Sequence, residues 1–183
     1  MLPDNDEAAL VARFRDGEEA ALEIIISRHK DPLFRFVVHY LNDATEAADV
    51  VSETFIRAWR NRASYRPNAA LQTWLFAIGV NLCRDHARKR KRRPGDFAIN
   101  QDESNLTRLV GGSQPDEEAE RRDEVEQLRQ AINALPHDLK TALVLNALEG
   151  HSQDEVAKML GCSRKAIETR VYRARKMLKA ALA

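Results

Sequence analysis

The chain has 183 residues, with 29 basic and 28 acidic side chains, a formal net charge of +1 and 44% hydrophobic residues. This composition fits one or two small globular domains and excludes a wholly disordered chain. No apolar run approaches the roughly 18 residues of a membrane span, and the acidic N-terminus is unlike a signal peptide, so we expect no membrane insertion. Cys83 and Cys162 are far apart in the sequence, which argues against a disulfide scaffold or a cysteine-based metal site and favours a reducing cytoplasm.

The near-zero net charge conceals a blocky distribution. Residues 57–93 carry 11 basic and one acidic side chain, and residues 164–183 carry seven basic and one acidic. Between them, residues 94–126 carry three basic and ten acidic side chains. Two basic segments separated by an acidic one indicate two surfaces for a polyanion; solvated helix faces are the alternative for either block.

The first part of the chain predicts a helical bundle. An amphipathic helix is expected from Glu18 to Leu41, kinked or restarted at Pro32. Thr45 is expected to cap a second helix through Arg62. The stripes expected to be buried comprise Ala21, Leu22, Ile25, Leu33, Phe36, Val37 and Leu41 in the first helix and Ala48, Val51, Phe55 and Ala58 in the second.

A basic helix and a break follow. Residues 64–69 contain Pro67 and Asn68 and predict a loop, and a helix begins near Ala70 with the core line Leu71, Leu75, Ile78 and Leu82. Pro94-Gly95 ends it, and helical periodicity is lost until about residue 115. We therefore expect an all-α chain of two small helical domains, residues 1–93 and 117–183, joined by a flexible acidic linker over residues 94–116.

The C-terminal segment has the most specific pattern. After helices expected from Glu117 to Leu135 and from Pro136 to Glu149, Ser152 and Glu155 have capping-box spacing. Gly161 suits a left-handed turn between two short helices. This layout predicts a helix-turn-helix, with an ordinary helical hairpin as the alternative. Its second helix is expected to bind DNA through Ser163, Arg164, Lys165, Glu168, Thr169, Tyr172, Arg173 and Lys176, with Lys165, Glu168 and Thr169 able to read base edges.

Two further faces occur in the N-terminal half. The basic helix places Asn81, Arg84, Arg88 and Lys91 on one face, suited to phosphate and base contacts. Tyr65, Trp74 and Phe76 are candidates for a pocket that holds unstacked bases, although core packing is the alternative for Trp74. The preceding helix instead exposes Asp49, Glu53, Ile56, Arg57 and Arg60, which suits a partner helix or, alternatively, solvated ion pairs within the helix.

These residues carry a family resemblance. EAADVVSETFIRAW, from Glu46 to Trp59, and LQTWLFAIGVN, from Leu71 to Asn81, resemble conserved region 2 of an extracytoplasmic-function sigma factor. AINALP, from Ala131 to Pro136, and the segment from Glu155 to Arg175 resemble region 4 of the same family. The resemblance covers nearly the whole chain in the family's order.

The resemblance implies a non-enzymatic specificity subunit of bacterial RNA polymerase without cofactors. In that family the surface matched by Asp49, Glu53 and Arg57 docks on the core polymerase. The matched segment 65–70 with Asn81, Arg84 and Arg88 captures the −10 promoter element, and the recognition helix reads the −35 element. Such proteins are commonly sequestered by an anti-sigma factor, which we expect as a further partner.

The chain departs from the family pattern at three places. Lys165-Ala166 stands where many members have Gly-Thr, Glu168 occupies a position that is often basic, and Ser52 replaces a common Gln. A carboxylate at residue 168 repels phosphate but accepts a hydrogen bond from a cytosine amino group, so an altered −35 preference is expected.

Two other functional classes compete with this interpretation. A stand-alone helix-turn-helix regulator predicts tight DNA binding without polymerase, but it leaves the Asp49–Glu53 stripe unexplained. An enzyme built on the histidines is disfavoured, since His29, His39, His86, His137 and His151 are scattered and no Gly-rich phosphate loop is present.

Overall fold

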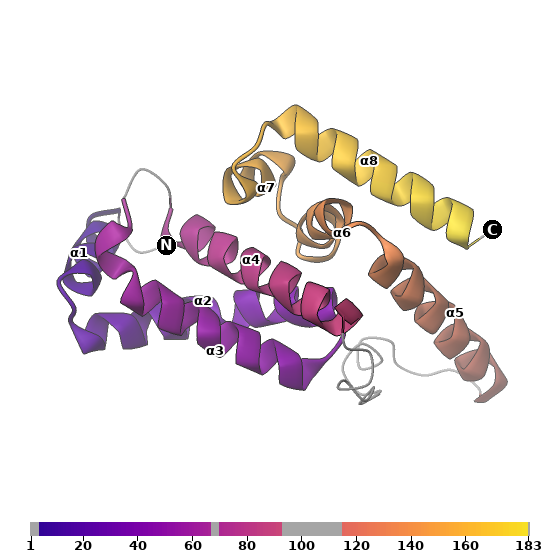
Figure 1. Ribbon diagram of the computed structural model, residues 1–183, viewed down its shortest axis with the longest axis horizontal. Helices are drawn as coiled ribbons and strands as arrows, with labels where there is room; N and C mark the ends of the chain where they lie inside the picture. Colours follow the sequence, from indigo (N-terminus) through magenta and orange to yellow (C-terminus); the bar gives the residue numbers. More distant parts are fainter. Residues whose placement is uncertain (1–3, 67–69, 93–114, 183) are drawn as a thin grey trace.

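The computed structural model describes residues 4–66, 70–92 and 115–182, and every regular element in these ranges is helical. The N-terminal lobe, residues 4–92, contains α1 (Asp4–Arg15), α2 (Glu19–Leu41), α3 (Ala44–Arg60), a 3-10 turn (Arg62–Ser64) and α4 (Leu71–Arg92). The C-terminal lobe, residues 115–182, contains α5 (Pro115–Ala134), α6 (His137–Leu143), a π-helical turn (Val144–Leu148), α7 (Gln153–Leu160) and α8 (Arg164–Ala181). The predicted all-α class is confirmed. Figure 1 shows the two lobes.

The long helix α2 forms the centre of the N-terminal lobe. Its residues Ile25, Leu33 and Phe36 are fully buried. The predicted restart at Pro32 is wrong, because one helix continues through this residue. Proline removes one backbone hydrogen bond, and burial of apolar side chains on both sides of it offsets that loss.

Helix α3 begins with a cap different from the one predicted. Asp43, not Thr45, caps the helix: its carboxylate accepts a hydrogen bond from the Glu46 amide at 2.9 Å. The buried stripe contains Ala47, whereas Ala48 is exposed, contrary to prediction. Both Thr45 and Asp43 fit the capping pattern, so the sequence does not decide which of them caps the helix. Two adjacent alanines give no polarity contrast, so the sequence does not decide which of them is buried.

Helices α2 and α4 approach closely at Gly79. A Cβ atom at this position would lie 2.9 Å from Leu33 Cδ1, well inside ordinary contact distance. Leu33 is itself fully buried and has little room to move. The absence of a side chain at Gly79 therefore sets the spacing that holds α4 in its place.

The C-terminal helix pair has the predicted helix-turn-helix features. Ser152 Oγ accepts from the Glu155 amide at 3.2 Å, and Glu155 accepts from the Ser152 amide at 2.8 Å, which completes a capping box. These hydrogen bonds to the carboxylate lower the pKa of Glu155. Gly161 has φ +61, and Ser163 Oγ accepts from the Ala166 amide at the start of α8. The left-handed turn and the second cap are thus confirmed.

The helices before this pair differ from prediction in detail. Helix α5 begins at Pro115, two residues before the expected Glu117. The single helix expected from Pro136 to Glu149 is divided into α6 and a π-helical turn. A π-turn changes the hydrogen-bond pattern without requiring a glycine or proline, so the sequence contains no clear signal for it.

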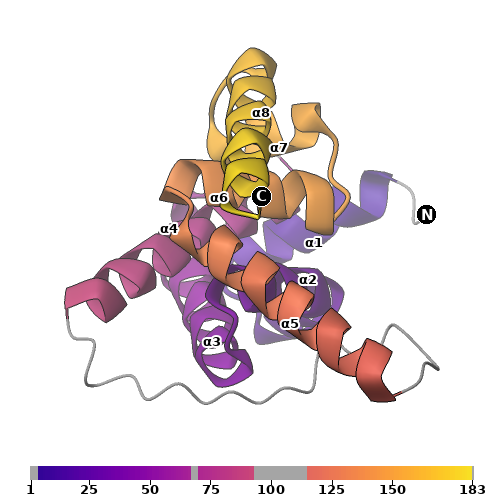
Figure 2. The ribbon, with the colours of Figure 1, turned by 90° about the vertical axis from the view of Figure 1, so that its right-hand side faces the viewer.

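The two lobes share one apolar core in the part of the chain that the structure describes. Buried residues from Leu10 through Cys83 and from Ala142 through Val171 form one continuous cluster. Phe76 lies at the junction, with its ring centroid 5.7 Å from those of both Phe36 and His151. Helix α4 packs on α7, and α2 packs on the π-helical turn. Figure 2 shows the C-terminal lobe lying across the N-terminal helices.

The aromatic residues predicted to hold unstacked bases differ in burial. Phe76 is 1% exposed and Tyr65 is 3% exposed, so both belong to the core and neither presents an open ring face. Trp74 is half-buried and packs on Tyr65, with ring centroids 5.1 Å apart. In the described ranges, no helix is long and apolar enough to cross a membrane.

Candidate nucleic-acid interface

Helix α3 presents a mixed charged and apolar surface, which we call the docking stripe: Asp49, Glu53, Ile56, Arg57 and Arg60. Asp49 and Arg60 are exposed, and Ile56 is 44% exposed. Glu53 Oε1 accepts from Arg57 Nε at 2.7 Å, so both partners stay at the surface as an i,i+4 pair. An exposed ion pair of this kind adds little to stability. The stripe is therefore available to a partner at small cost.

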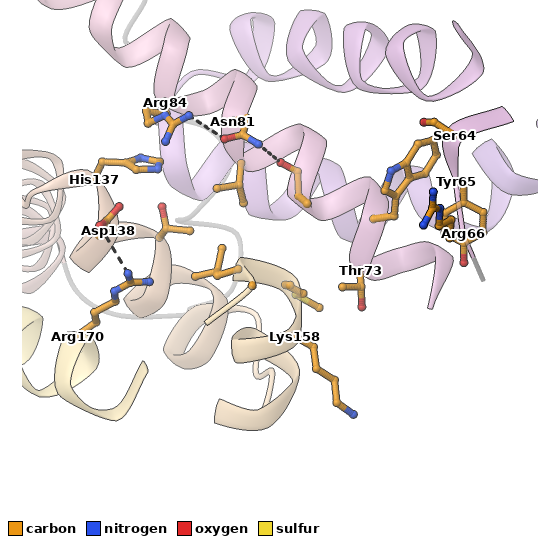
Figure 3. A pocket seen from close by; sticks show the side chains of 17 residues that line it. Ser64, Tyr65, Arg66, Thr73, Asn81, Arg84, His137, Asp138, Lys158 and Arg170 are labelled. Carbon is orange, nitrogen blue, oxygen red and sulfur yellow. Dashed lines mark hydrogen bonds and ion pairs between the residues drawn. The ribbon is translucent and has the colours of Figure 1, made fainter. Parts of the chain in front are cut away.

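Helix α4 contributes one wall of a cleft between the lobes. The cleft has a volume of about 560 Å³, and Figure 3 shows its polar side chains. Asn81 and Arg84 line it from α4, and Arg84 donates to Asn81 Oδ1 at 2.9 Å. Tyr65 and Trp74 line it nearer the start of α4. The structure thus brings together four of the residues predicted for the −10 element.

The other predicted residues of this group lie elsewhere. Arg88 is exposed on α4 beyond the cleft. Asn68 and the side chain of Lys91 lie outside the described residues. The basic face of α4 is thus partly covered by the C-terminal lobe and partly open.

Sequence reasoning missed the residues on the opposite wall of the cleft. His137, Asp138, Lys158 and Arg170 line it from the C-terminal lobe. Arg170 pairs with Asp138 at 3.7 Å and donates to Cys162 Sγ at 3.6 Å. The helical period places each of these residues on a face, but no pattern in the sequence indicates that this face meets α4.

Helix α8 presents an outward stripe on the side away from its core residues Ile167, Val171 and Ala174. Lys165, Tyr172 and Lys176 are exposed, and Tyr172 reaches 67% exposure. Spacings of four, three and four residues put the stripe Lys165, Thr169, Tyr172 and Lys176 on one helix face. Arg164, Glu168 and Arg173 flank it and are exposed, and Ser163 caps the helix. All eight predicted residues therefore belong to the exposed side or the N-terminus of α8.

The N-terminal turn of α8 contains a pairing that the sequence did not single out. Lys165 Nζ lies 3.1 Å from both carboxylate oxygens of Glu168. Arg164 pairs with Asp154 of α7 at 3.4 Å, with both side chains largely exposed. Glu168 thus neutralises the lysine beside it and lowers the positive charge at the leading end of the helix.

The thiol and metal-ligand chemistry of the described residues is limited. Cys83 is fully buried, and burial raises the pKa of its thiol to about 12, so the nucleophilic thiolate is suppressed. Within the described ranges, no three His, Cys, Asp or Glu side chains are grouped closely enough to hold a metal ion.

The fold and surfaces define a two-lobed helical DNA-binding protein with a C-terminal helix-turn-helix. Residues 25–93 match the family model described as "Sigma-70 region 2", and residues 125–178 match "Sigma-70, region 4". The chain belongs to the sigma-70 family and is a sigma factor of the extracytoplasmic-function type.

Sigma factors from three bacteria are similar to this chain along nearly the full length of both sequences. The chain is 32% identical to an RNA polymerase sigma-H factor of Pseudomonas aeruginosa, over 100% of this chain and 96% of the relative. It is 31% identical to an ECF RNA polymerase sigma-E factor of Haemophilus influenzae, over 94% and 93% of the two chains. The corresponding factor of Escherichia coli is 30% identical over 94% and 92%.

Two solved structures share the arrangement of helices. CnrH, solved in complex with the cytosolic domain of CnrY, has a TM-score of 0.67 and 28% identity, covering 96% of both chains. RpoE of Bartonella quintana, solved with the anti-sigma factor NepR, has a TM-score of 0.60 and 26% identity, covering 87% of this chain and 95% of that one. Sigma factors direct transcription initiation rather than catalyse a reaction, and the resemblance inferred from the sequence is confirmed at the level of the family.

Proposed function

We propose that the chain assigns three of its surfaces to three tasks of promoter-specific initiation. The docking stripe on α3 binds core RNA polymerase, the basic face of α4 engages the −10 element, and the outward stripe of α8 reads the −35 element. The observation that carries the proposal is that these surfaces lie on three different helices of a chain that matches both sigma regions. We propose residues 1–93 and 117–183 as the two functional domains, with residues 94–116 as the linker.

The docking stripe suits a helical partner. Asp49 offers an exposed carboxylate, and the Glu53–Arg57 pair can exchange its partners for those of a facing helix. Ile56 adds apolar contact at the centre of the stripe. Contact with a partner then removes apolar surface from water while the charges fix the register.

The α4 face suits melted DNA. Arg84 and Arg88 supply phosphate contacts, and Asn81 supplies both a donor and an acceptor for a base edge. The half-buried Trp74 offers part of an aromatic surface beside them. Free energy from trapping unstacked bases in this way offsets the cost of opening the duplex. Tyr65 then acts as a support for Trp74, because its own ring is buried.

The α8 stripe suits the major groove. Lys176 and Arg173 neutralise phosphates, and Thr169 and Tyr172 face the groove. Glu168 accepts from a cytosine amino group once Lys165 turns to a phosphate. This exchange distinguishes the −35 preference of the chain from that of relatives with a basic residue at the same place.

We also propose a cytoplasmic anti-sigma partner. Both solved relatives named above were captured with another protein, a cytosolic domain in one case and an anti-sigma factor in the other. Such a partner would bind the exposed surfaces of both lobes and release the chain to core polymerase on a signal.

A charge reversal of the docking stripe tests the proposal. The variant Asp49→Arg with Glu53→Arg is expected to lose binding to core polymerase in a pull-down while keeping its helical circular dichroism, since Asp49 is exposed and the Glu53 side chain is 38% exposed. A matched control is Glu19→Arg with Glu23→Arg, which makes the same i,i+4 charge change on an exposed face of α2. Loss of binding in both variants, or in neither, would remove the docking assignment.

A further inference from the structure

The cleft between the lobes has an excess of positive charge on both walls. Arg66 and Arg84 line it from the N-terminal lobe, and Lys158 and Arg170 line it from the C-terminal lobe. Asp138 is the one carboxylate among the described lining residues. Within the described ranges, Arg170 is the only one of the four cations with an ion-pair partner, which is Asp138. Like charges on facing walls repel one another, so this arrangement favours an anion between them.

Arg84 presents a hydrogen-bond donor that the described part of the chain does not satisfy. One of its terminal nitrogens donates to Asn81 Oδ1, but its Nε is buried and has no hydrogen-bond partner there. A buried guanidinium nitrogen without an acceptor costs free energy, because it has given up its contact with water. An anionic oxygen bound beside Arg84 would supply the acceptor and a charge partner together.

The positive potential in this part of the cleft also acts on His137. This residue lines the cleft near Arg84 (Figure 3). Burial is the main cause that lowers the pKa of its imidazole; Asp138 opposes this, and the charges of Arg84 and Arg88 lower the pKa further. A polyanion bound beside the imidazole would therefore raise the pKa of His137.

The other end of the cleft offers an aromatic surface. Trp74 is half-buried, lines the cleft and packs on the buried Tyr65, with ring centroids 5.1 Å apart. Figure 3 shows Tyr65 and Arg66 at one end of the cleft and Arg84 with His137 at the other. Trp74 and Arg84 are ten residues apart on α4, which separates them by about 15 Å along the helix axis. A ligand that contacts both therefore carries an aromatic ring and its anionic groups at opposite ends.

We propose that this cleft binds a free nucleoside polyphosphate, with the base against Trp74 and the phosphates beside Arg84 and Arg170. A volume of about 560 Å³ lies within the range of pockets that hold small ligands. Stacking on an aromatic ring tolerates any base, so the site recognises the class of ligand rather than one base. Arg170 of the C-terminal lobe takes no part in the promoter contacts proposed above, and the site can be measured in the chain alone, without polymerase or promoter.

Matched arginine variants test both walls of the cleft. Arg84→Ala and Arg170→Ala each remove one cation that lines it, whereas Arg92→Ala and Arg175→Ala remove exposed arginines of the same two helices outside it. Isothermal titration calorimetry of the full chain with ATP is expected to show one site. Loss of a charged hydrogen-bond partner weakens binding roughly tenfold or more, so we expect this loss in the two cleft variants and the parent affinity in the two controls. Equal losses in all four variants, or no ATP binding by the folded parent chain, would overturn the proposal.

Tripolyphosphate and adenosine separate the contribution of the phosphates from that of the base. Both should bind more weakly than ATP, because each contacts only one end of the cleft. Tripolyphosphate that binds as tightly as ATP would show a site for charge alone and would overturn the assignment to a nucleotide. A single-stranded oligonucleotide that displaces ATP at lower concentration, with the same losses in Arg84→Ala and Arg170→Ala, would also overturn it, because the cleft would then hold a DNA strand.

Two nuclear magnetic resonance signals report whether the ligand lies in the cleft. The indole N–H of Trp74, identified by its loss in Trp74→Phe, should shift on addition of ATP, whereas that of Trp59, which packs on Phe14, should not. The pKa of His137 should rise with ATP bound, since the phosphates offset the nearby cations. ATP binding without either change would place the nucleotide elsewhere and overturn the proposal. A chain that binds ATP as expected but directs no transcription would contradict the proposed promoter function and leave the nucleotide site supported.

Discussion

The phosphate contacts proposed for α8 predict how strongly promoter binding depends on salt. The double variant Arg173→Ala with Lys176→Ala removes two exposed cations from the proposed −35 surface without touching the helix core. Each phosphate contact contributes roughly 0.9 to the slope of log affinity against log salt, so the slope should fall in magnitude by about 1.8. The defect should then be about tenfold larger at 50 mM than at 200 mM salt.

The assay compares holoenzymes reconstituted with each variant. Promoter-complex formation is measured across salt concentrations with a fluorescent promoter fragment that carries both elements. Lys179→Ala is the control, since it removes a cation of the same helix near its C-terminal end, one turn beyond the proposed contacts. An unchanged salt slope for the double variant would refute the argument that these side chains neutralise phosphates.

Four further predictions concern melting, specificity, packing and pH. Arg84→Ala with Arg88→Ala should weaken open-complex formation, and normal permanganate reactivity at the −10 element would count against the role of α4. Glu168→Arg should change base preference at one or two −35 positions in a binding selection, and an unchanged profile would mean that this residue does not face the bases. Gly79→Ala should destabilise the chain by roughly 1–3 kcal/mol in denaturant unfolding, because the added Cβ meets Leu33, and wild-type stability would show that α2 and α4 can separate freely. Burial lowers the pKa of His137, so the stability that the neutral imidazole contributes is present above pH 6.5 and is lost as the pH falls. The His137→Gln variant should therefore lose less stability than the parent between pH 7.5 and 5.5. An equal loss in both proteins would contradict the lowered pKa.

Local chemistry predicted the C-terminal helix pair well. Ser152 with Glu155, Gly161 and Ser163 each meet a specific backbone demand at a helix end, so the sequence alone located the turn and both caps. The exposed stripes of α3 and α8 followed from helical period in the same way, because a period fixes which residues share a face.

Helical periodicity and capping patterns do not predict which helices pack against one another. Helical periodicity identified Phe36 as buried, but it does not say that Phe76 meets both this residue and His151 of the other lobe. The burial of the Glu149 side chain against His39 of the other lobe carries no local signal, since a single Glu at a helix end is ordinarily a surface residue. His39, His137 and His151 are far apart in the sequence, yet the fold gathers them at one junction between the lobes.

The most direct test of the central claim is reconstitution with bacterial core RNA polymerase. The purified chain is mixed with core enzyme, the complex is isolated, and run-off transcription is carried out on genomic fragments. The account predicts stoichiometric binding to core and new start sites, each preceded by the same pair of −35 and −10 sequences. No binding to core, together with tight promoter binding by the chain alone, would contradict it.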